Sequence, residues 1–296
     1  MGLRCLTAMH ATRSSDIVSI ITFDDSLDSR HVFQELHCFG EQYRIPVTVT
    51  RGSADLNAAV RSSEPELAIV CGWYSMIAAD ARGAARRGFI GVHNSLLPKY
   101  RGAAPLVWAM LQGEGEVGLS MYTLTSGMDD GDIWAQTSIQ VGPDDYIGEV
   151  LGRLEDACDE MIRHAYPRIL EDDIKPVPQD SAKATYGTLR TRDHGRIQWH
   201  DPVNRIYRWV RAQSKPYPGA FTSCDGRRLT IWRAHPFALP YNGRPGEVVR
   251  GPSGEMMVIC GDGRALVIDA MQLDDEPIDA GWDSVRPRTV LGGTLT

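Results

Sequence analysis

His93 is the residue of this sequence best placed to move a proton. Residues 88–93, GFIGVH, form a short apolar run that ends in the histidine, and a Ser-Leu-Leu-Pro turn follows. This pattern predicts a buried strand that delivers a side chain to its carboxyl end, where ligands bind in open α/β sheets. Imidazole titrates near neutral pH and can accept a proton from a reacting group. The competing interpretation is a structural histidine in the core, which is the commoner case for a single histidine.

A second candidate, Asp129, lies in an acidic loop, SGMDDGD, at residues 126–132. A carboxylate beside a histidine orients the ring and favours its protonated form. The alternative is a solvated turn, because Asp and Gly are common turn formers. The loop does not favour a metal at Asp129, Asp130 and Asp132, since it has neither the Ca²⁺-loop spacing nor a nearby histidine. The sequence also contains no Walker A motif and no GxSxG motif.

Alternating strands and helices must position these side chains. Helices are expected at 3–12, 31–44, 55–61 and 79–86, buried strands at 17–23, 67–72 and 89–93, and a further short strand at 46–49. This alternation predicts an α/β fold with a doubly wound, mainly parallel sheet. Further strands at 118–124 and 133–141 bracket the acidic loop, and a helix is expected at 144–170. The sequence opens on a helix, so the strand that normally precedes it in a βαβ unit is missing. A variable N-terminus and a true start farther upstream both account for this.

The composition changes in the C-terminal third of the chain. Residues 176–190 are rich in proline and polar residues, which predicts a linker. Beyond it, short strands are expected at 196–199, 229–234, 247–249, 255–260 and 265–271, with one helix near 202–212. Short strands separated by Gly and Pro turns predict a small β-barrel-like domain. We therefore expect a catalytic domain at 1–175 and an OB-like β domain at 191–296.

The bulk composition excludes several classes of protein. The 296 residues carry a net charge of -7, which argues against strong electrostatic binding of nucleic acid. The six cysteines form no CxxC pair, which argues against a zinc site or a disulfide framework. A reducing cytoplasm is the expected setting. No apolar run has the roughly 20 residues of a membrane span.

Three segments together resemble a known family. They are Gly72-Trp73-Tyr74, GVHNSLLPKYRGAAPLVWAML at 91–111, and GMDDGDI at 127–133. They look like the folate-dependent formyltransferases, a group that includes methionyl-tRNA formyltransferase and the amino-sugar N-formyltransferases. Residues 193–232 are similar to the C-terminal domain of the same family. The resemblance implies a Rossmann-like catalytic domain that transfers a formyl group from N10-formyltetrahydrofolate to a primary amine without a metal.

The resemblance also implies roles for individual residues. His93 is the base and Asp129 its partner. The folate would contact Gly72, Trp73, Tyr74 and Met76 on one loop, and Gly127, Asp130 and Asp132 on the other. The substrate would contact Ser95, Lys99 and Arg101. The competing interpretation is ordinary core for Trp73 and Tyr74, and a solvated loop for Lys99 and Arg101.

The sequence departs from the family pattern at one position. Members usually carry Asn-x-His, and the asparagine helps to hold the formyl oxygen; here the matching residue is Gly91. Asn94 is a conceivable substitute, but neighbouring residues of an extended strand point to opposite faces, so a turn would have to redirect it. Gly91 marks either a subfamily or an inactive relative.

The amine acceptor is predicted from charge. Methionyl-tRNA formyltransferases carry a basic insertion after their second strand, whereas residues 24–30 here, DDSLDSR, are acidic and short. This favours a small molecule, such as a nucleotide-linked amino sugar or a hydroxylated ornithine, over tRNA. The alternatives are a methionyl-tRNA formyltransferase, whose C-terminal domain contacts tRNA, and a non-catalytic protein that binds folate or a nucleotide. The sequence does not indicate an oligomeric state.

Overall fold

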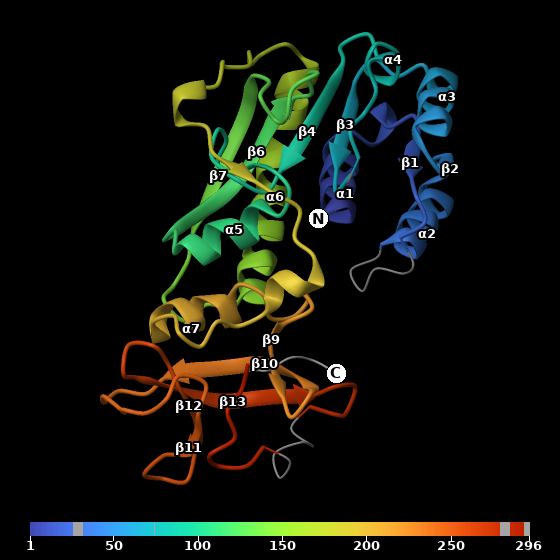
Figure 1. The fold of residues 1–296 in the computed structure, drawn as a ribbon. Coiled ribbons are helices and arrows are strands. Elements are labelled where there is room, and N and C mark those ends of the chain that lie inside the picture. The colour runs from blue at the N-terminus through green and yellow to red at the C-terminus, as the bar shows by residue number, and fades with distance from the viewer. Residues whose placement is uncertain (26–31, 74, 279–284, 293–296) are drawn as a thin grey trace. The chain divides into compact units, whose positions relative to one another are not determined.

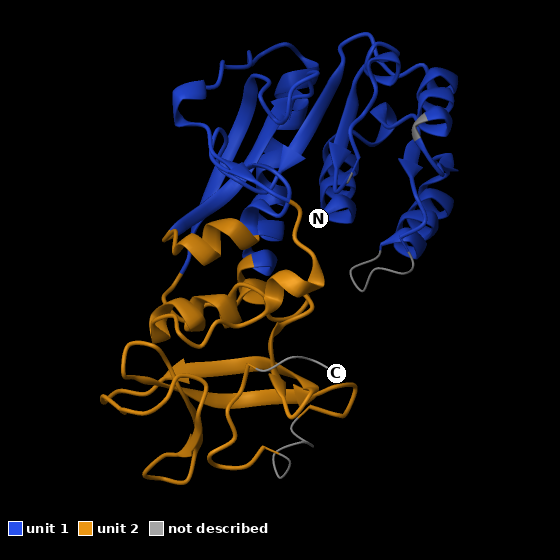
Figure 2. Cartoon of the chain, viewed as in Figure 1, with its two compact units in different colours: residues 1–106, 116–141, 151–188 blue, residues 107–115, 142–150, 189–296 orange. Residues whose placement is uncertain are grey.

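The computed structural model describes residues 1–25, 32–73, 75–278 and 285–292. The chain divides into two compact units, which Figure 2 colours separately. The first unit comprises residues 1–106, 116–141 and 151–188, and the second comprises residues 107–115, 142–150 and 189–296. The predicted domain boundaries at 175 and 191 stay a prediction.

The first unit contains the strand and helix alternation that the sequence predicts (Figure 1). Its strands are β1 (Ile20–Thr22), β2 (Val47–Val49), β3 (Ala68–Cys71), β4 (Phe89–His93), β5 (Arg101–Gly102), β6 (Glu116–Thr123), β7 (Ile133–Gln140) and β8 (Tyr186–Gly187). The helices up to residue 188 are α1 (Gly2–Arg13), α2 (Phe33–Tyr43), α3 (Ser53–Ser63), α4 (Ala79–Arg82), α5 (Pro105–Gln112) and α6 (Ile147–Leu170). Helix α4 is shorter than predicted, and a turn replaces its second half.

The strands of this unit pair in both directions. The four-stranded sheet has the order β3-β4-β6-β7, in which β3 and β4 are parallel and the other two pairs are antiparallel. Strands β1 and β2 form a separate parallel pair. Strand β5 pairs with β8, which lies in the segment predicted to be a linker. The α/β class with a Rossmann-like first part is confirmed.

Burial decreases along β4 from Phe89 toward His93 at its end. Phe89 and Ile90 are buried because β4 lies between β3 and β6 and under the side chains that cover the sheet. Residues 92 and 93 are only partly buried. This burial stabilises an apolar strand, because each Å² of apolar surface removed from water contributes about 25 cal/mol to the free energy of folding. The sequence therefore anchors the start of β4 and leaves its carboxyl end open for a polar side chain.

The second unit is built on a five-stranded antiparallel sheet with the order β11-β12-β13-β10-β9. These strands are β9 (Ala220–Cys224), β10 (Arg227–Pro236), β11 (Val248–Arg250), β12 (Met256–Ile259) and β13 (Ala265–Leu273). The sheet packs with helix α7 (Val203–Arg211) around one apolar core, which confirms the smaller C-terminal β domain. The predicted strand at 196–199 is wrong. That segment follows a 3₁₀ helix and, within the described ranges, forms one isolated bridge, between Arg196 and Phe221, instead of a strand.

Candidate active site

Strands β4 and β6 present four candidate side-chain positions on one face of the sheet. Gly91 lies opposite Tyr122, and His93 lies opposite Ser120, in the antiparallel register. Residues two apart on a strand point to the same face, so these four positions share it. The register therefore places a histidine, a phenol and a hydroxyl beside a position that has no side chain.

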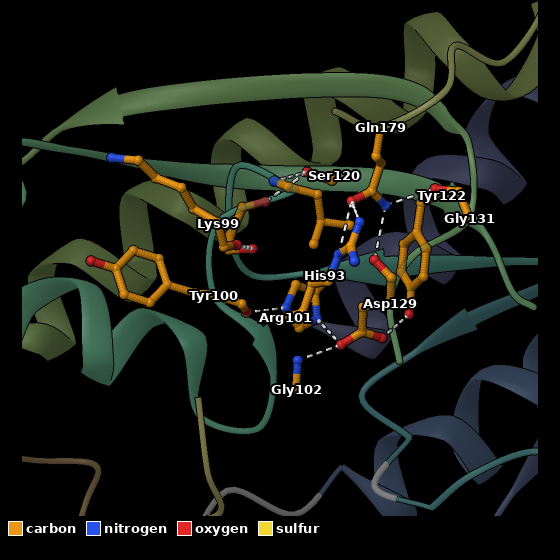
Figure 3. A network of polar contacts seen from close by, with 12 residues as sticks. His93, Lys99, Tyr100, Arg101, Gly102, Ser120, Tyr122, Asp129, Gly131 and Gln179 are labelled. Carbon is orange, nitrogen blue, oxygen red and sulfur yellow. Dashed lines mark hydrogen bonds and ion pairs between the residues drawn. The ribbon is translucent and has the colours of Figure 1, made fainter. Parts of the chain in front are cut away.

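His93 is held by the loop that follows β4. Its Nε2 lies 2.8 Å from the carbonyl oxygen of Tyr100 (Figure 3). Tyr100 has a φ of 56°, and its N–H donates to the hydroxyl of Thr185 at 2.8 Å, so this carbonyl has a defined direction. A carbonyl only accepts hydrogen bonds, so the neutral ring carries its proton on Nε2. The lone pair is then on Nδ1.

Asp129 faces that lone pair. Its Oδ2 lies 3.7 Å from Nδ1 of His93, and both side chains are mostly buried. A proton that reaches Nδ1 is therefore stabilised by an adjacent carboxylate. The predicted pairing of His93 with Asp129 is thus present as a geometry, and its catalytic role stays a proposal.

Both oxygens of the Asp129 carboxylate have protein partners. Oδ2 accepts the N–H of Gly102 at 2.6 Å. Oδ1 accepts the hydroxyl of Tyr122, and Figure 3 shows the two side chains pointing toward each other. Burial, and then the charge of Asp129, raise the pKa of Tyr122 well above its usual range. The phenol consequently stays protonated and acts as a donor to the carboxylate.

Gly91 provides the room for this phenol. A Cβ at position 91 would lie 2.7 Å from Cε1 of Tyr122 and 3.0 Å from Cδ2 of Leu124. The first of these distances is closer than carbon atoms approach each other without a shift of one of them. The tyrosine ring therefore lies where a side chain at position 91 would begin.

A second network fixes the main chain of the Asp129 loop. Nε2 of Gln179 donates to the carbonyl of Asp129 at 2.8 Å and to that of Gly131 at 2.7 Å. Its Oε1 accepts from Nη2 and Nε of Arg101 at 2.8 and 3.1 Å. Arg101 is only 3% exposed and also donates to the hydroxyl of Tyr186. Its guanidinium is thus engaged within the protein, and the predicted contact of Arg101 with substrate stays a prediction.

The other predicted site residues around this turn, Asn94, Ser95 and Lys99, differ in burial and in their contacts. Ser95 is buried, and its hydroxyl donates to the carbonyl of Lys99 at 2.7 Å, which stabilises the turn. The Lys99 side chain is exposed and extends away from His93 (Figure 3). Asn94 directly follows β4 in a bend and is partly buried. The substrate roles of Ser95 and Lys99 and the catalytic role of Asn94 stay predictions.

Gly127, Asp130 and Asp132 of the 126–132 loop bond to residues that directly precede the loop. Asp130 accepts the hydroxyl of Thr125, and the N–H of Gly127 donates to the same hydroxyl at 3.1 Å. The carbonyl of Asp132 accepts from the N–H of Thr123 at 2.9 Å. These contacts shape a compact turn, and folate contacts from Gly127, Asp130 and Asp132 stay predictions.

The loop after β3 carries the predicted aromatic wall. Gly72 has a φ of 73°, which favours glycine. Trp73 packs edge-on against Phe23, with ring centroids 5.2 Å apart, and its buried Nε1 has no hydrogen-bond partner among the described residues. Met76 is 63% exposed. Tyr74 lies outside the described residues.

Sequence reasoning missed Tyr122 and Gln179. Tyr122 lies inside a predicted strand, and only the register with β4 reveals what it faces. Gln179 lies in the segment predicted to be a linker. Across the described ranges, no group of three or more His, Cys, Asp or Glu side chains could hold a metal ion. No helix in the same part of the chain is long and apolar enough to cross a bilayer.

Two family models match the chain. The model described as "Formyl transferase" covers residues 13–166, and the model described as "Formyl transferase, C-terminal domain" covers residues 190–283. The first therefore spans more than half of the chain and includes the His93–Asp129 pair.

The individual proteins that the chain resembles carry different names. The chain is 35% identical to a methionyl-tRNA formyltransferase of Anaeromyxobacter dehalogenans over 231 residues, which are 77% of this chain and 73% of the relative. The sugar 3N-formyl transferase WlaRD has a TM-score of 0.69 at 15% identity, over 93% of this chain and 94% of its own. HypX from Aquifex aeolicus has a TM-score of 0.66 at 21% identity over 88% of this chain, which spans 45% of HypX. The two structural likenesses show the fold.

Proposed function

The chain belongs to the formyl transferase family, and on that premise we propose that it transfers a formyl group from N10-formyltetrahydrofolate to the primary amine of a small molecule. The observation that carries this proposal is the His93–Asp129 pair at the carboxyl end of β4. That end of a strand is the usual ligand edge of an α/β sheet.

The chemistry follows from the protonation state of His93. The acceptor amine attacks the formyl carbon and forms a C–N bond, and the amine loses a proton to Nδ1 of His93. The adjacent carboxylate of Asp129 stabilises the resulting imidazolium. Collapse of the tetrahedral intermediate breaks the bond to N10 of the folate, and N10 takes up the proton that His93 received from the amine. The products are the formamide and tetrahydrofolate.

The loop after β3 offers an observation that fits a folate. The indole Nε1 of Trp73 is buried and has no hydrogen-bond partner within the described residues. A buried donor without an acceptor costs roughly 1–3 kcal/mol, which a bound heteroaromatic ring with acceptor atoms would recover. The exposed Met76 adds apolar surface on the same loop. Gly72, Trp73 and Met76 would hold the pterin there, and Gly127, Asp130 and Asp132 would bear on its polar edge.

The choice of a small amine rests on charge. The net charge is -7, so the surface as a whole does not favour a polyanion. Residues 26–30 of the acidic segment 24–30 lie outside the described part of the chain, so the effect of this segment on acceptor choice stays a prediction. A nucleotide-linked amino sugar and a hydroxylated ornithine are the proposed acceptor classes.

Methionyl-tRNA is the second candidate acceptor. The 35% identical relative from Anaeromyxobacter dehalogenans is named a methionyl-tRNA formyltransferase, and the matched length covers most of both chains. The same formyl chemistry at His93 serves either acceptor, because both present a primary amine.

An acceptor panel tests the proposal. Purified protein is incubated with N10-formyltetrahydrofolate and, separately, with amino sugar nucleotides, hydroxylated ornithine and methionyl-tRNA. Product formation is followed by mass spectrometry and tetrahydrofolate release by absorbance. We expect formylation of a small amine in the wild type and none in His93→Ala.

The other outcomes are equally decisive. Efficient formylation of methionyl-tRNA alone would replace the small-molecule proposal with the second candidate. Folate binding without formylation of any acceptor would instead identify a non-catalytic binding protein, which is the remaining alternative for a chain with Gly91.

A further inference from the structure

Gly91 and Tyr122 form a cross-strand pair in the middle of the candidate active site. They lie directly opposite each other on β4 and β6. A Cβ at position 91 would lie 2.7 Å from the ring of Tyr122. Glycine opposite an aromatic residue is an arrangement in which the ring covers the strand that lacks a side chain. The ring therefore extends across β4 toward the loop that carries Asp129.

The hydroxyl at the end of that ring bonds to the catalytic candidate Asp129. It donates to Oδ1, while Oδ2 receives the N–H of Gly102 and lies 3.7 Å from Nδ1 of His93. A carboxylate rotates about its last bond unless both oxygens are engaged. With Oδ1 bound to Tyr122, the carboxylate is fixed with Oδ2 on the side of His93. The His93 and Tyr122 rings are 6.1 Å apart and nearly perpendicular, so the phenol does not displace the imidazole.

Burial and the charge of Asp129 both raise the pKa of this phenol. It is therefore a permanent donor at neutral pH and cannot itself act as the base.

We propose that Tyr122 is a positioning residue of the formyl transfer reaction, which holds the Asp129 carboxylate toward His93, and that Gly91 is required because the Tyr122 ring occupies its side-chain space. This inference rests on the proposed function of the His93–Asp129 pair. It accounts for the absence of a side chain at position 91, because an asparagine there would force the Tyr122 ring to shift.

A double-mutant cycle tests whether Tyr122 acts through Asp129. Tyr122→Phe keeps the ring over Gly91 and removes only the hydroxyl. We expect kcat to fall about 10- to 100-fold, as for a small misplacement of a catalytic group, with the KM for folate within about threefold. Asp129→Asn should lower kcat more, and the double variant should be no slower than Asp129→Asn alone. Tyr43→Phe, at an exposed tyrosine of α2, is the matched control and should retain full activity.

The cycle separates the two levels of the proposal. A wild type that formylates no acceptor would refute the proposed function. The pairing of Gly91 with Tyr122 would then be tested by thermal unfolding, which needs no substrate. An active wild type with an equally active Tyr122→Phe variant would refute this inference alone. Additive losses in the double variant would also refute it, because Tyr122 would then act on the substrate independently of Asp129.

Thermal unfolding tests the steric part without any substrate. Gly91→Ala should lower the unfolding temperature in the wild type, because its Cβ meets the Tyr122 ring. In a Tyr122→Ala background, Gly91→Ala should lower the unfolding temperature by markedly less than it does in the wild type. Equal costs in both backgrounds would contradict the pairing. If Tyr122→Ala does not fold, Tyr122→Leu serves as the background with a smaller, flexible side chain.

Discussion

Replacing Gln179 with alanine should loosen the loop that carries Asp129 and leave the strands in place. One side-chain amide of Gln179 joins two parts of the candidate site. Its nitrogen donates to the carbonyls of Asp129 and Gly131, and its oxygen accepts two hydrogen bonds from the buried Arg101. Alanine has no amide group, so the substitution removes both hydrogen bonds to the loop.

The expected loss of stability can be worked out from these bonds. Each of the two neutral bonds contributes about 1 kcal/mol to folding. The Arg101 guanidinium, which is 3% exposed, keeps its bond to Tyr186 but loses its main acceptor, at a cost of roughly 1.5–3 kcal/mol. Relaxation and entering water offset part of this sum, so we expect a net loss of about 3 kcal/mol. For a unit of this size that lowers the unfolding temperature by roughly 6–12 °C.

Activity should fall as well, because the Asp129 main chain can then shift relative to His93. A displacement of about 1 Å costs on the order of 100-fold in rate. The assay combines calorimetry or fluorescence unfolding with kcat for formyl transfer. Gln112→Ala, at an exposed glutamine at the end of α5, is the control and should change neither quantity.

Gln179→Glu separates the two halves of the network. It keeps an acceptor for Arg101 but sets a carboxylate oxygen against the carbonyls of Asp129 and Gly131. We expect stability above that of Gln179→Ala and an equally low kcat. Wild-type stability and wild-type kcat in Gln179→Ala would refute the reasoning, since the hydrogen bonds would then contribute nothing to the loop.

Three further predictions concern other parts of the first unit. His93→Ala should lower kcat by about 100- to 10,000-fold, as for loss of a general base, while folate binding measured by calorimetry persists; a fully active variant would remove His93 from the mechanism. Trp73→Phe should weaken folate binding about tenfold, and any fall in unfolding temperature should come from lost ring packing against Phe23 and not from a lost hydrogen bond, since Nε1 has no partner in the described ranges; unchanged affinity would contradict a contact between Trp73 and the pterin. Burial, and then the charge of Asp16, raise the pKa of Tyr166 to about 12. The folded state therefore holds this proton more tightly than the unfolded chain, in which tyrosine ionises near pH ~10. The stabilisation is complete below that pH and is lost as the pH rises toward 12. Tyr166→Phe should therefore reduce the fall in unfolding free energy across this pH window, as measured by denaturant titrations. The same dependence of unfolding free energy on pH in variant and wild type would refute the raised pKa of Tyr166.

Local sequence pattern was sufficient for most of the elements of the fold. Short apolar runs bounded by turn residues predicted all six main strands of the first unit, because burial of such a run is decided by the run itself. Local sequence pattern failed at 196–199, where the residues alternate as in a strand but the described residues show only an isolated bridge, between Arg196 and Phe221. It also missed β9, whose five residues are all buried and lack a simple alternation.

The sequence by itself determined the chemistry that the site has available. The apolar run ending in His93 and the acidic loop with Asp129 are each legible locally, and the family resemblance joined them as a pair. The predicted linker is the clearest limit of that approach. Proline and polar residues at 176–190 favour an irregular segment, and nothing local shows that Gln179 bonds to Arg101 and to the Asp129 loop.

Only the tertiary structure decided how the pair is held. In the sequence, Gly91 shows only that a side chain is missing at this position. In the antiparallel register of β4 with β6, the Tyr122 ring occupies the space where that side chain would lie. The tautomer of His93 likewise follows from a carbonyl seven residues away in a turn, and the direction of Asp129 follows from Tyr122 and Gly102. Strand register and loop closure bring together residues that are distant along the chain, and hydrogen bonds with such directions exist only once that packing is complete.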